Sequence, residues 1–277
     1  HANIELKTFK GGYENRQLYE LIQNGADAID PSGPGGRIHV ILTEAALYCA
    51  NEGEPVDRQG VINLLLAHVS DKRKDEIGRF GIGFKSLLGI SDNPQFLSRT
   101  GSFEYDKATA RSKIREIVRS ARDTPILRIA EPIDPAVAAG GDEVLKELMK
   151  WAATVVHVPL KSGKLRGLSA NLAEFPAEFC LFSSHVSSLV LEDRANDSKR
   201  EISIAVDNEV IELTDQGETK TWRLFKTMYA PSRRAKTDAG ELTDRDEVPL
   251  AWAVPIDHRY SGKFWAFFPT EYETTLS

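Results

Sequence analysis

The sequence predicts an α/β protein whose second half is rich in short strands, and three observations lead to this prediction. Up to residue 160, segments with helical spacing alternate with extended, β-branched segments. Beyond Lys161, short extended runs follow one another with polar turns between them. With 41% hydrophobic and 27% charged residues, the composition is that of an ordinary globular protein. We therefore expect one domain over residues 1–165 and a β-rich region over residues 166–277.

Apolar spacing and chain-breaking residues place the individual elements. Helical spacing of apolar residues predicts a first helix over 15–29, which the Pro- and Gly-rich stretch 31–36 ends. The same spacing predicts further helices over 59–68, near 85–88, and over 107–122 and 142–151. Aliphatic and β-branched runs predict strands over 37–42, 46–49, 94–98, 102–105, 126–129 and 153–160, the third and fourth of which form a hairpin. In the second region, strands are expected over 186–191, 201–206, 209–213, 221–225, 250–255 and 264–268.

Charge, cysteine content and hydropathy exclude several classes of protein. The formal net charge is −6, so the charge of the whole chain does not indicate a nucleic-acid partner. Cys49 and Cys180, the two cysteines, are far apart and have no neighbouring metal ligands, which argues against a disulfide framework and a zinc site. No apolar run approaches the ~20 residues of a membrane-spanning helix. We expect a cytoplasmic protein without a membrane segment, and a fragment of a longer chain.

The first predicted helix carries three polar residues at helical spacing. Glu20, Asn24 and Asp27 are four and three residues apart and therefore lie on one face, opposite the apolar face. Such a pattern by itself usually marks a solvated face. The residue types nevertheless suit a magnesium nucleotide, because Mg²⁺ prefers oxygen ligands and a carboxylate can deprotonate a water beside the terminal phosphate.

A turn follows the second predicted strand. It reads Asn51-Glu52-Gly53-Glu54-Pro55. A glycine there lets the backbone approach a flat ring, and the oxygen of Asn51 can accept a hydrogen bond from an exocyclic amine such as that of adenine. Asn, Gly and Pro also favour surface turns for local reasons, so the turn alone does not establish a site.

A glycine-rich segment at residues 77–86 reads Ile-Gly-Arg-Phe-Gly-Ile-Gly-Phe-Lys-Ser. Closely spaced glycines at the start of a helix leave backbone N–H groups available to phosphate oxygens, with Lys85 as an added positive charge. The spacing is that of neither a Walker loop nor a Rossmann fingerprint. The segment predicts a phosphate site of another type.

Taken in order, these three segments resemble the N box and the two glycine boxes of the GHKL ATPases, the superfamily of gyrase, the ninety-kilodalton heat-shock chaperone, histidine kinases and mismatch-repair ATPases. The turn at residues 51–55 and the Gly-Phe-Lys-Ser ending are most similar to the sacsin-type, chaperone-like branch. The resemblance covers residues 14–160 or so. It implies a two-layer α/β sandwich of the Bergerat type, with helices on one face of a mixed, mainly antiparallel sheet.

The resemblance also implies roles for particular residues. Glu20 matches the general base, Asn24 the magnesium ligand and Asp27 a carboxylate that helps to hold the site. Asn51 stands where the family usually has an Asp that reads the adenine amine, and Gly53 keeps the turn. An amide oxygen still accepts a hydrogen bond, although it discriminates less by charge.

Other matches concern phosphates, adenine and the lid. Thr154 stands where the family has a Thr that reaches adenine through water, although Thr is common in strands for structural reasons. Residues 56–77 match the ATP lid, in which Ser70, Lys72 and Arg73 are candidates to meet phosphates. The residues matching the phosphate-binding segment are Gly78, Gly81, Ile82, Gly83, Phe84 and Lys85.

The expected function is magnesium-dependent binding and slow hydrolysis of ATP, driving lid closure and remodelling of a partner. A protein partner, or self-association through regions outside this chain, is expected, and the β-rich region is interpreted as the start of a coupling domain. The alternative is a nucleotide-sensing module that binds ATP with negligible turnover. A histidine-kinase core is disfavoured because no phosphoacceptor helix precedes the N box.

Overall fold

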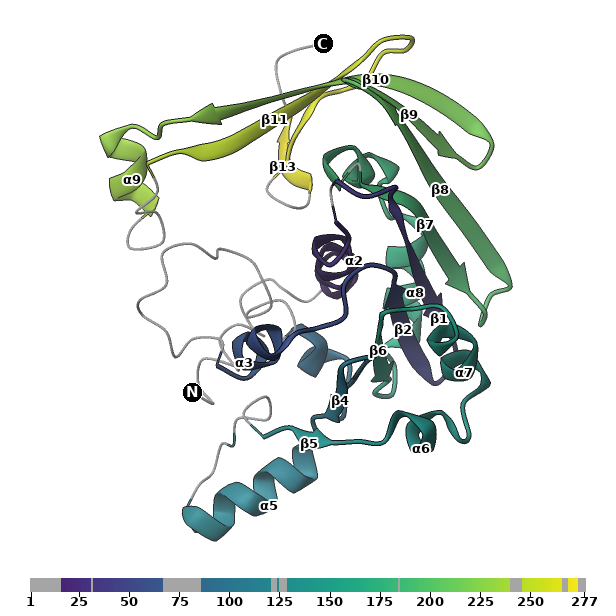
Figure 1. The fold of residues 1–277 in the computed structure, drawn as a ribbon, viewed down its shortest axis with the longest axis vertical. Coiled ribbons are helices and arrows are strands. Elements are labelled where there is room, and N and C mark those ends of the chain that lie inside the picture. Colours follow the sequence, from purple (N-terminus) through teal and green to yellow (C-terminus); the bar gives the residue numbers. More distant parts are fainter. Residues whose placement is uncertain are drawn as a thin grey trace.

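The computed structural model describes residues 16–30, 32–66, 86–120, 124, 129–183, 185–239, 246–265 and 269–273 (Figure 1). Within these residues an eleven-stranded sheet runs in the order β11-β10-β9-β8-β7-β1-β2-β6-β3-β4-β5, and β12 and β13 form a separate pair. In the large sheet, β1 and β7 are parallel and all other neighbours are antiparallel. The chain is therefore an α/β protein with a mixed, mainly antiparallel sheet.

The strands of the first half are those that the sequence predicts, with the exception of 126–129. They are β1 (Gly36–Leu42), β2 (Ala46–Asn51), β3 (Gln95–Ser98), β4 (Gly101–Glu104) and β6 (Thr154–Pro159), joined by the short β5 (Glu131–Pro132). β3 and β4 form the predicted hairpin. Residues 125–128, most of the strand expected at 126–129, lie outside the described residues.

Helices precede, separate or follow these strands along the chain. The described helices are α2 (Gln17–Asp27), α3 (Arg58–Leu66), η1 (Leu87–Gly89), α5 (Lys107–Ile117), α6 (Pro135–Ala139), α7 (Glu143–Met149), α8 (Leu165–Ala173), η2 (Ala177–Ser183) and α9 (Arg233–Ala239). α6, α8, η2 and α9 are absent from the sequence prediction. Three of these four have seven or fewer residues, too few for a periodic apolar pattern to be recognised.

Helices cover both faces of the central strands, whereas the resemblance implied helices on one face only. Leu47 and Cys49 on β2 pack with α2 and α8, while Ala46, Tyr48 and Ala50 on the other face pack with α6 and α7. All six residues of β2 are buried for this reason. A strand buried on both faces does not alternate between apolar and polar residues, and β2 fits this description because it is apolar on both faces.

The strands of the second half continue the same sheet (Figure 1). β7 (Val186–Asp193) pairs with β1, and β8 (Ser198–Asp207), β9 (Val210–Asp215), β10 (Glu218–Tyr229) and β11 (Val248–Pro255) follow as antiparallel neighbours. β12 (Lys263–Trp265) and β13 (Pro269–Glu273) form the separate hairpin. The division at residue 165 stays a prediction, and the sheet itself runs across it. Of the described helices, none is both long and apolar enough to cross a membrane.

Candidate functional site

Helix α2 carries the polar face that the sequence predicts for this segment. Leu18, Leu21 and Ile22 are at most 3% exposed and pack in the core between α2 and the sheet. Glu20, Asn24 and Asp27 are half-buried. A helix fixed to a sheet by its apolar face must present its opposite face away from the sheet, and here that face carries two carboxylates and an amide.

Asn51 lies beside α2 at the end of β2. A Cβ added to Gly25 would be 3.3 Å from the Cβ of Asn51, so the missing side chain of this helical glycine is what allows the two to approach. Asn51 is 5% exposed, and its Nδ2 donates to the carbonyl oxygen of Glu52 over 2.8 Å. The amide oxygen is the one side-chain atom of Asn51 that can accept a hydrogen bond.

The turn after Asn51 is fastened to the last turn of α2. The backbone N–H of Glu54 donates to the carbonyl oxygen of Ala28 over 2.8 Å. Gly53 has φ +106°, and a Cβ added to it would be 2.3 Å from that same oxygen. Only glycine combines this left-handed backbone with so close an approach, so Gly53 is required for the turn to dock on the helix.

Thr154 lies next to Asn51 in the sheet, because the two residues are paired in the ladder between β2 and β6. Its Oγ1 donates to Oγ of Ser98 on β3 over 3.0 Å, and both side chains are buried. Ser98 Oγ also accepts from the backbone N–H of Val56 over 3.1 Å. A buried pair of hydroxyls thus joins the end of β6 to the segment that leads into α3, the first part of the expected lid.

Gln17, in the first turn of α2, meets the end of the glycine-rich segment. Its Nε2 donates to the carbonyl oxygen of Ser86 over 3.4 Å, and Gln17 is 2% exposed. Ser86 directly follows the predicted phosphate-binding residues in the sequence. The predicted residues Gly78, Gly81, Ile82, Gly83, Phe84 and Lys85, and residues 67–77 of the expected lid, lie outside the described residues.

Burial changes the electrostatics of Glu20. Loss of solvent raises the pKa of its carboxyl, the positive charge of Arg16 lowers it, and the negative charge of Asp27 raises it. Asp27 accepts a hydrogen bond at Oδ1 from Nε2 of Gln23 over 2.9 Å. A carboxylate whose pKa is raised by burial is a stronger base than an exposed one, which is the property that a general base needs.

The donor set suits a cation that is held mainly by phosphates. Among the described residues, no group of three or more His, Cys, Asp and Glu side chains is arranged to hold a metal ion by itself. Asn24 offers one neutral oxygen on the open face of α2. Mg²⁺ in nucleotide sites usually takes one or two protein oxygens and completes its shell with phosphates and water, so the residues fit that cation.

A surface hollow of about 980 Å³ lies elsewhere, along α5. Its walls include Lys107, Arg111 and Arg115, and none of the residues predicted for the nucleotide site lines it. We therefore do not equate this hollow with the predicted site.

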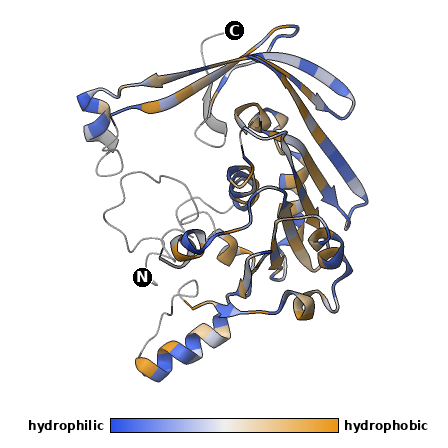
Figure 2. Cartoon of the chain, viewed as in Figure 1, coloured by the Kyte–Doolittle hydropathy of each residue, from blue (hydrophilic) through white to orange (hydrophobic). Residues whose placement is uncertain are grey.

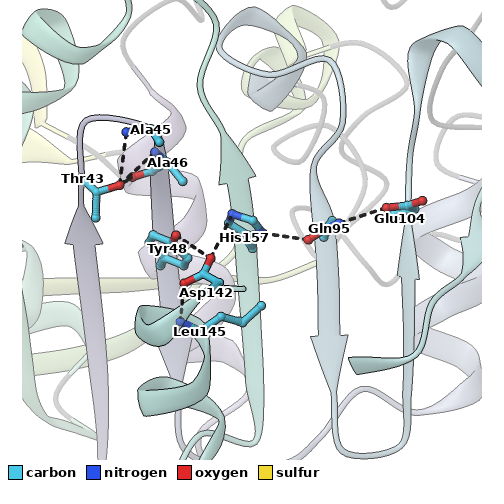
Figure 3. A network of polar contacts seen from close by, with 9 residues as sticks. All are labelled: Thr43, Ala45, Ala46, Tyr48, Gln95, Glu104, Asp142, Leu145 and His157. Atoms are coloured by element: carbon cyan, nitrogen blue, oxygen red, sulfur yellow. Dashed lines mark hydrogen bonds and ion pairs between the residues drawn. The ribbon is translucent and has the colours of Figure 1, made fainter. Parts of the chain in front are cut away.

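The opposite face of β6 holds a network of polar contacts (Figure 3). Tyr48 Oη donates to Oδ2 of Asp142 over 2.7 Å, and the Tyr48 ring stacks on His157 with centroids 4.8 Å apart. Asp142 Oδ1 also accepts from the backbone N–H of Leu145 and so caps α7. His157 Nδ1 lies 2.7 Å from Oε1 of Gln95. The network fastens α7 to the sheet on the side away from α2.

Six predicted residues lie on α2 or in the segments next to it. Glu20, Asn24 and Asp27 share the outward face of the helix, Asn51 lies against its inward face, Gly53 lies against its C-terminal end, and Thr154 pairs with Asn51. Sequence reasoning missed Gln17 and Ser98, which hold the region together. Their partners are 69 and 56 residues away along the chain, and no local pattern reveals such contacts.

No protein-family model matches the chain, and no curated protein matches it significantly.

Proposed function

We propose that this chain binds ATP together with Mg²⁺ and hydrolyses it slowly, using the region between α2 and the ends of β2 and β6. The observation that supports the proposal most is that α2, which carries Glu20 and Asn24 on its outward face, packs with its inward face against Asn51, the ladder partner of Thr154. These four residues carry the base, the cation ligand and the adenine contacts in the GHKL resemblance. In this proposal residues 1–165 form a nucleotide-binding fold of that type.

Glu20 orients and deprotonates the water that attacks the terminal phosphate. Burial supports this role because it raises the pKa of the carboxyl and thereby its basicity. Asn24, one turn further along the same face, holds the cation through its amide oxygen. The cation, when bound, neutralises charge on the phosphates.

Asn51 and Thr154 receive the adenine. The amide oxygen of Asn51 accepts from the exocyclic amine, and Thr154, its partner in the adjacent strand, contacts the adenine through a bridging water. Gly53 keeps the backbone close to the ring. Gly78, Gly81, Ile82, Gly83, Phe84 and Lys85 complete the proposed phosphate site.

Phosphate release from ATP tests hydrolysis. We expect Glu20→Ala to keep the affinity for ATP and to slow turnover by about 10²–10⁴-fold, because a positioned base contributes that much. Glu44→Ala is the matched control, since Glu44 is an exposed carboxylate in the turn between β1 and β2. An unchanged rate in Glu20→Ala refutes the assignment of the base. If the wild-type chain binds ATP but releases no phosphate, the chain is a nucleotide sensor.

Calorimetry tests the cation ligand. We expect Asn24→Ala to weaken binding of ATP with Mg²⁺ much more than binding of adenosine without metal, because only the former uses the amide oxygen as a ligand. Equal losses in both titrations show that Asn24 is structural. Wild-type chain that binds neither ligand contradicts the proposed function as a whole.

A further inference from the structure

Strand β11 forms one edge of the large sheet, and its outward face is apolar. Its neighbour is β10, and no described strand pairs with its other side. Leu250, Trp252, Val254 and Ile256 alternate along the strand and its end, and their exposed fractions are between 44% and 53%. Hydrophobic colours follow part of β11 in Figure 2. An exposed apolar edge strand invites pairing with another strand.

The sequence of this strand is symmetric about Trp252. Residues 248–256 read Val-Pro-Leu-Ala-Trp-Ala-Val-Pro-Ile. Positions at equal distances before and after Trp252 carry the same or a similar residue. These pairs are two alanines, Leu250 and Val254, two prolines, and Val248 and Ile256. When a strand with this symmetry pairs with itself in antiparallel fashion, every residue lies opposite a similar one.

The hydrogen-bond groups of β11 alternate between the two sides of the strand. The backbone N–H of Ile256 donates to the carbonyl oxygen of Thr221 in β10 over 2.9 Å. The pairing between β10 and β11 has no register shift, so the same alternation holds along the whole strand. The even-numbered residues therefore bond to β10, and the odd-numbered ones direct their N–H and C=O groups to the free edge. Pro249 and Pro255 fall on the free edge, where a missing N–H costs no bond to β10.

Ala251 and Ala253 are thus the two residues of β11 that present an N–H to the free edge. In an antiparallel pair centred on Trp252, Ala251 of one copy lies opposite Ala253 of the other. Two residues opposite each other with outward groups exchange both of their backbone bonds. The pair of copies therefore has four such bonds, and the prolines end the ladder on both sides.

We propose that two copies of this chain associate through β11, antiparallel and with Trp252 on the twofold axis. The two Trp252 side chains meet at the centre, and Leu250 of each copy packs against Val254 of the other. Phe225, whose ring stacks on Trp252 with centroids 5.8 Å apart, widens the apolar surface. The association joins the two sheets edge to edge, and the cross-strand contacts bury part of the apolar side chains of both copies.

A second copy fits this edge better than an unrelated strand does. A second copy of β11 places similar side chains opposite each other and places its prolines opposite the prolines of the first copy. A strand of unrelated sequence does not give both matches. The contact is isologous, so each copy uses its edge once and the assembly closes at two. Acidic residues follow at both ends, Glu247 and Asp257, and their like charges disfavour a longer ladder.

Light scattering after gel filtration measures the association. The molar mass of the chain should rise from that of one copy toward that of two copies as concentration increases, from about 1 to about 100 μM. Trp252→Lys places two positive charges at the axis and should raise the dissociation constant about tenfold or more. Ala251→Pro removes an edge donor without touching the bonds to β10 and should also raise it, by about tenfold. Ile117→Lys, a change of an 85% exposed residue on α5, is the control and should leave it unchanged.

Oxidative cross-linking tests the register. Non-hydrogen-bonded partners in an antiparallel pair have Cα atoms about 4.5 Å apart, which suits a disulfide. The double variant Leu250→Cys with Val254→Cys should therefore form disulfide-linked dimers. Leu250→Cys alone should not, because two copies of position 250 are about 14 Å apart along the ladder. Circular dichroism verifies that each variant is folded.

Three results overturn the proposal. They are a chain that stays monomeric throughout the concentration range, a dimer that Trp252→Lys and Ala251→Pro weaken no more than Ile117→Lys does, and efficient cross-linking of Leu250→Cys alone. None of these measurements involves a nucleotide, so their outcome is independent of the proposed ATPase activity.

Discussion

Gly53 lies directly against Ala28: a Cβ added to the glycine would be 2.3 Å from the carbonyl oxygen of the alanine. The same oxygen accepts a hydrogen bond from the N–H of Glu54. One glycine therefore determines how closely the turn that follows β2 approaches the helix with the proposed catalytic residues.

Gly53→Ala should lower the free energy of unfolding by about 2 kcal/mol or more, because it combines a left-handed backbone with a clash against backbone atoms. Gly217→Ala is a matched control, since Gly217 has φ +84° and nothing within 4 Å of an added Cβ. We expect this control to lose about 1 kcal/mol, from the backbone alone. Urea unfolding of both variants measures the difference, and equal losses would show that the close approach is unimportant.

Glu20→Gln should stabilise the fold at neutral pH. Burial raises the pKa of Glu20 above its ordinary value of 4.5, so the folded state holds the proton more tightly than the unfolded state does. The stability that this carboxyl contributes is present below pH 4.5 and is lost as the pH rises through the folded pKa. Thermal unfolding should therefore give a higher Tm for Glu20→Gln than for wild type at pH 7, and similar values near pH 4. A lower Tm of the variant at pH 7 contradicts the prediction.

His157→Gln should make the fold less sensitive to acid. Burial lowers the pKa of His157 below its ordinary value of 6.5, and the negative charge of Asp142 raises it by a smaller amount. Since the unfolded state takes up the proton first, the stability is present above pH 6.5 and is lost as the pH falls below this value. We expect the wild-type Tm to fall between about pH 7 and pH 5, and the Tm of the variant to fall less.

At pH 8 the same variant should be less stable than wild type by about 1 kcal/mol, because it loses the ring stacked on Tyr48 (Figure 3). Burial also lowers the pKa of His39, so His39→Gln should reduce the acid sensitivity further when the two changes are combined. Identical slopes of Tm against pH in all three proteins would exclude both histidines as the cause.

Arg200→Lys should lower the free energy of unfolding by about 1–3 kcal/mol. Arg200 donates to both carboxylate oxygens of Asp215, over 2.8 and 2.6 Å, and to the carbonyl oxygen of Phe175 over 2.7 Å. The single ammonium group of a lysine cannot make the same three hydrogen bonds. Some of the bonds that join β8 to β9 and to the segment after α8 are therefore lost. Lys220→Ala is the control, because Lys220 lies 3.6 Å from an exposed Glu218 and should contribute less than about 1 kcal/mol. Chemical denaturation that gives equal losses for the two variants refutes the prediction.

The parts of the structure that the sequence predicted are those with a local cause. Apolar spacing on one face identified α2, and the structure buries Leu18, Leu21 and Ile22 as expected. The glycine at position 53 marked a turn, and that turn has the left-handed backbone that favours glycine. Such signals come from neighbouring residues, so no tertiary contact is needed to recognise them.

The parts that could not be predicted depend on residues far apart in sequence. Tyr48 and Asp142, 94 residues apart, join β2 to α7 and so help to cover the second face of the sheet. The sequence of β2 is apolar on both faces, which indicates burial but not which elements provide it. The hydroxyl pair of Ser98 and Thr154 likewise exists only because β3 and β6 are neighbours.

The amino-acid sequence alone determined the helix that carries Glu20, Asn24 and Asp27, the strands of the central sheet and the extended run at 250–255. Helical and extended periodicity are properties of the chain over a few residues, and burial of an apolar face follows from them. Tertiary structure alone decided that Asn51 lies against Gly25, that β7 pairs with β1, and that β11 is the last of the described strands at one edge of the sheet. Pairing between distant segments depends on which surfaces meet when the whole chain packs, and many partners are compatible with the same local pattern.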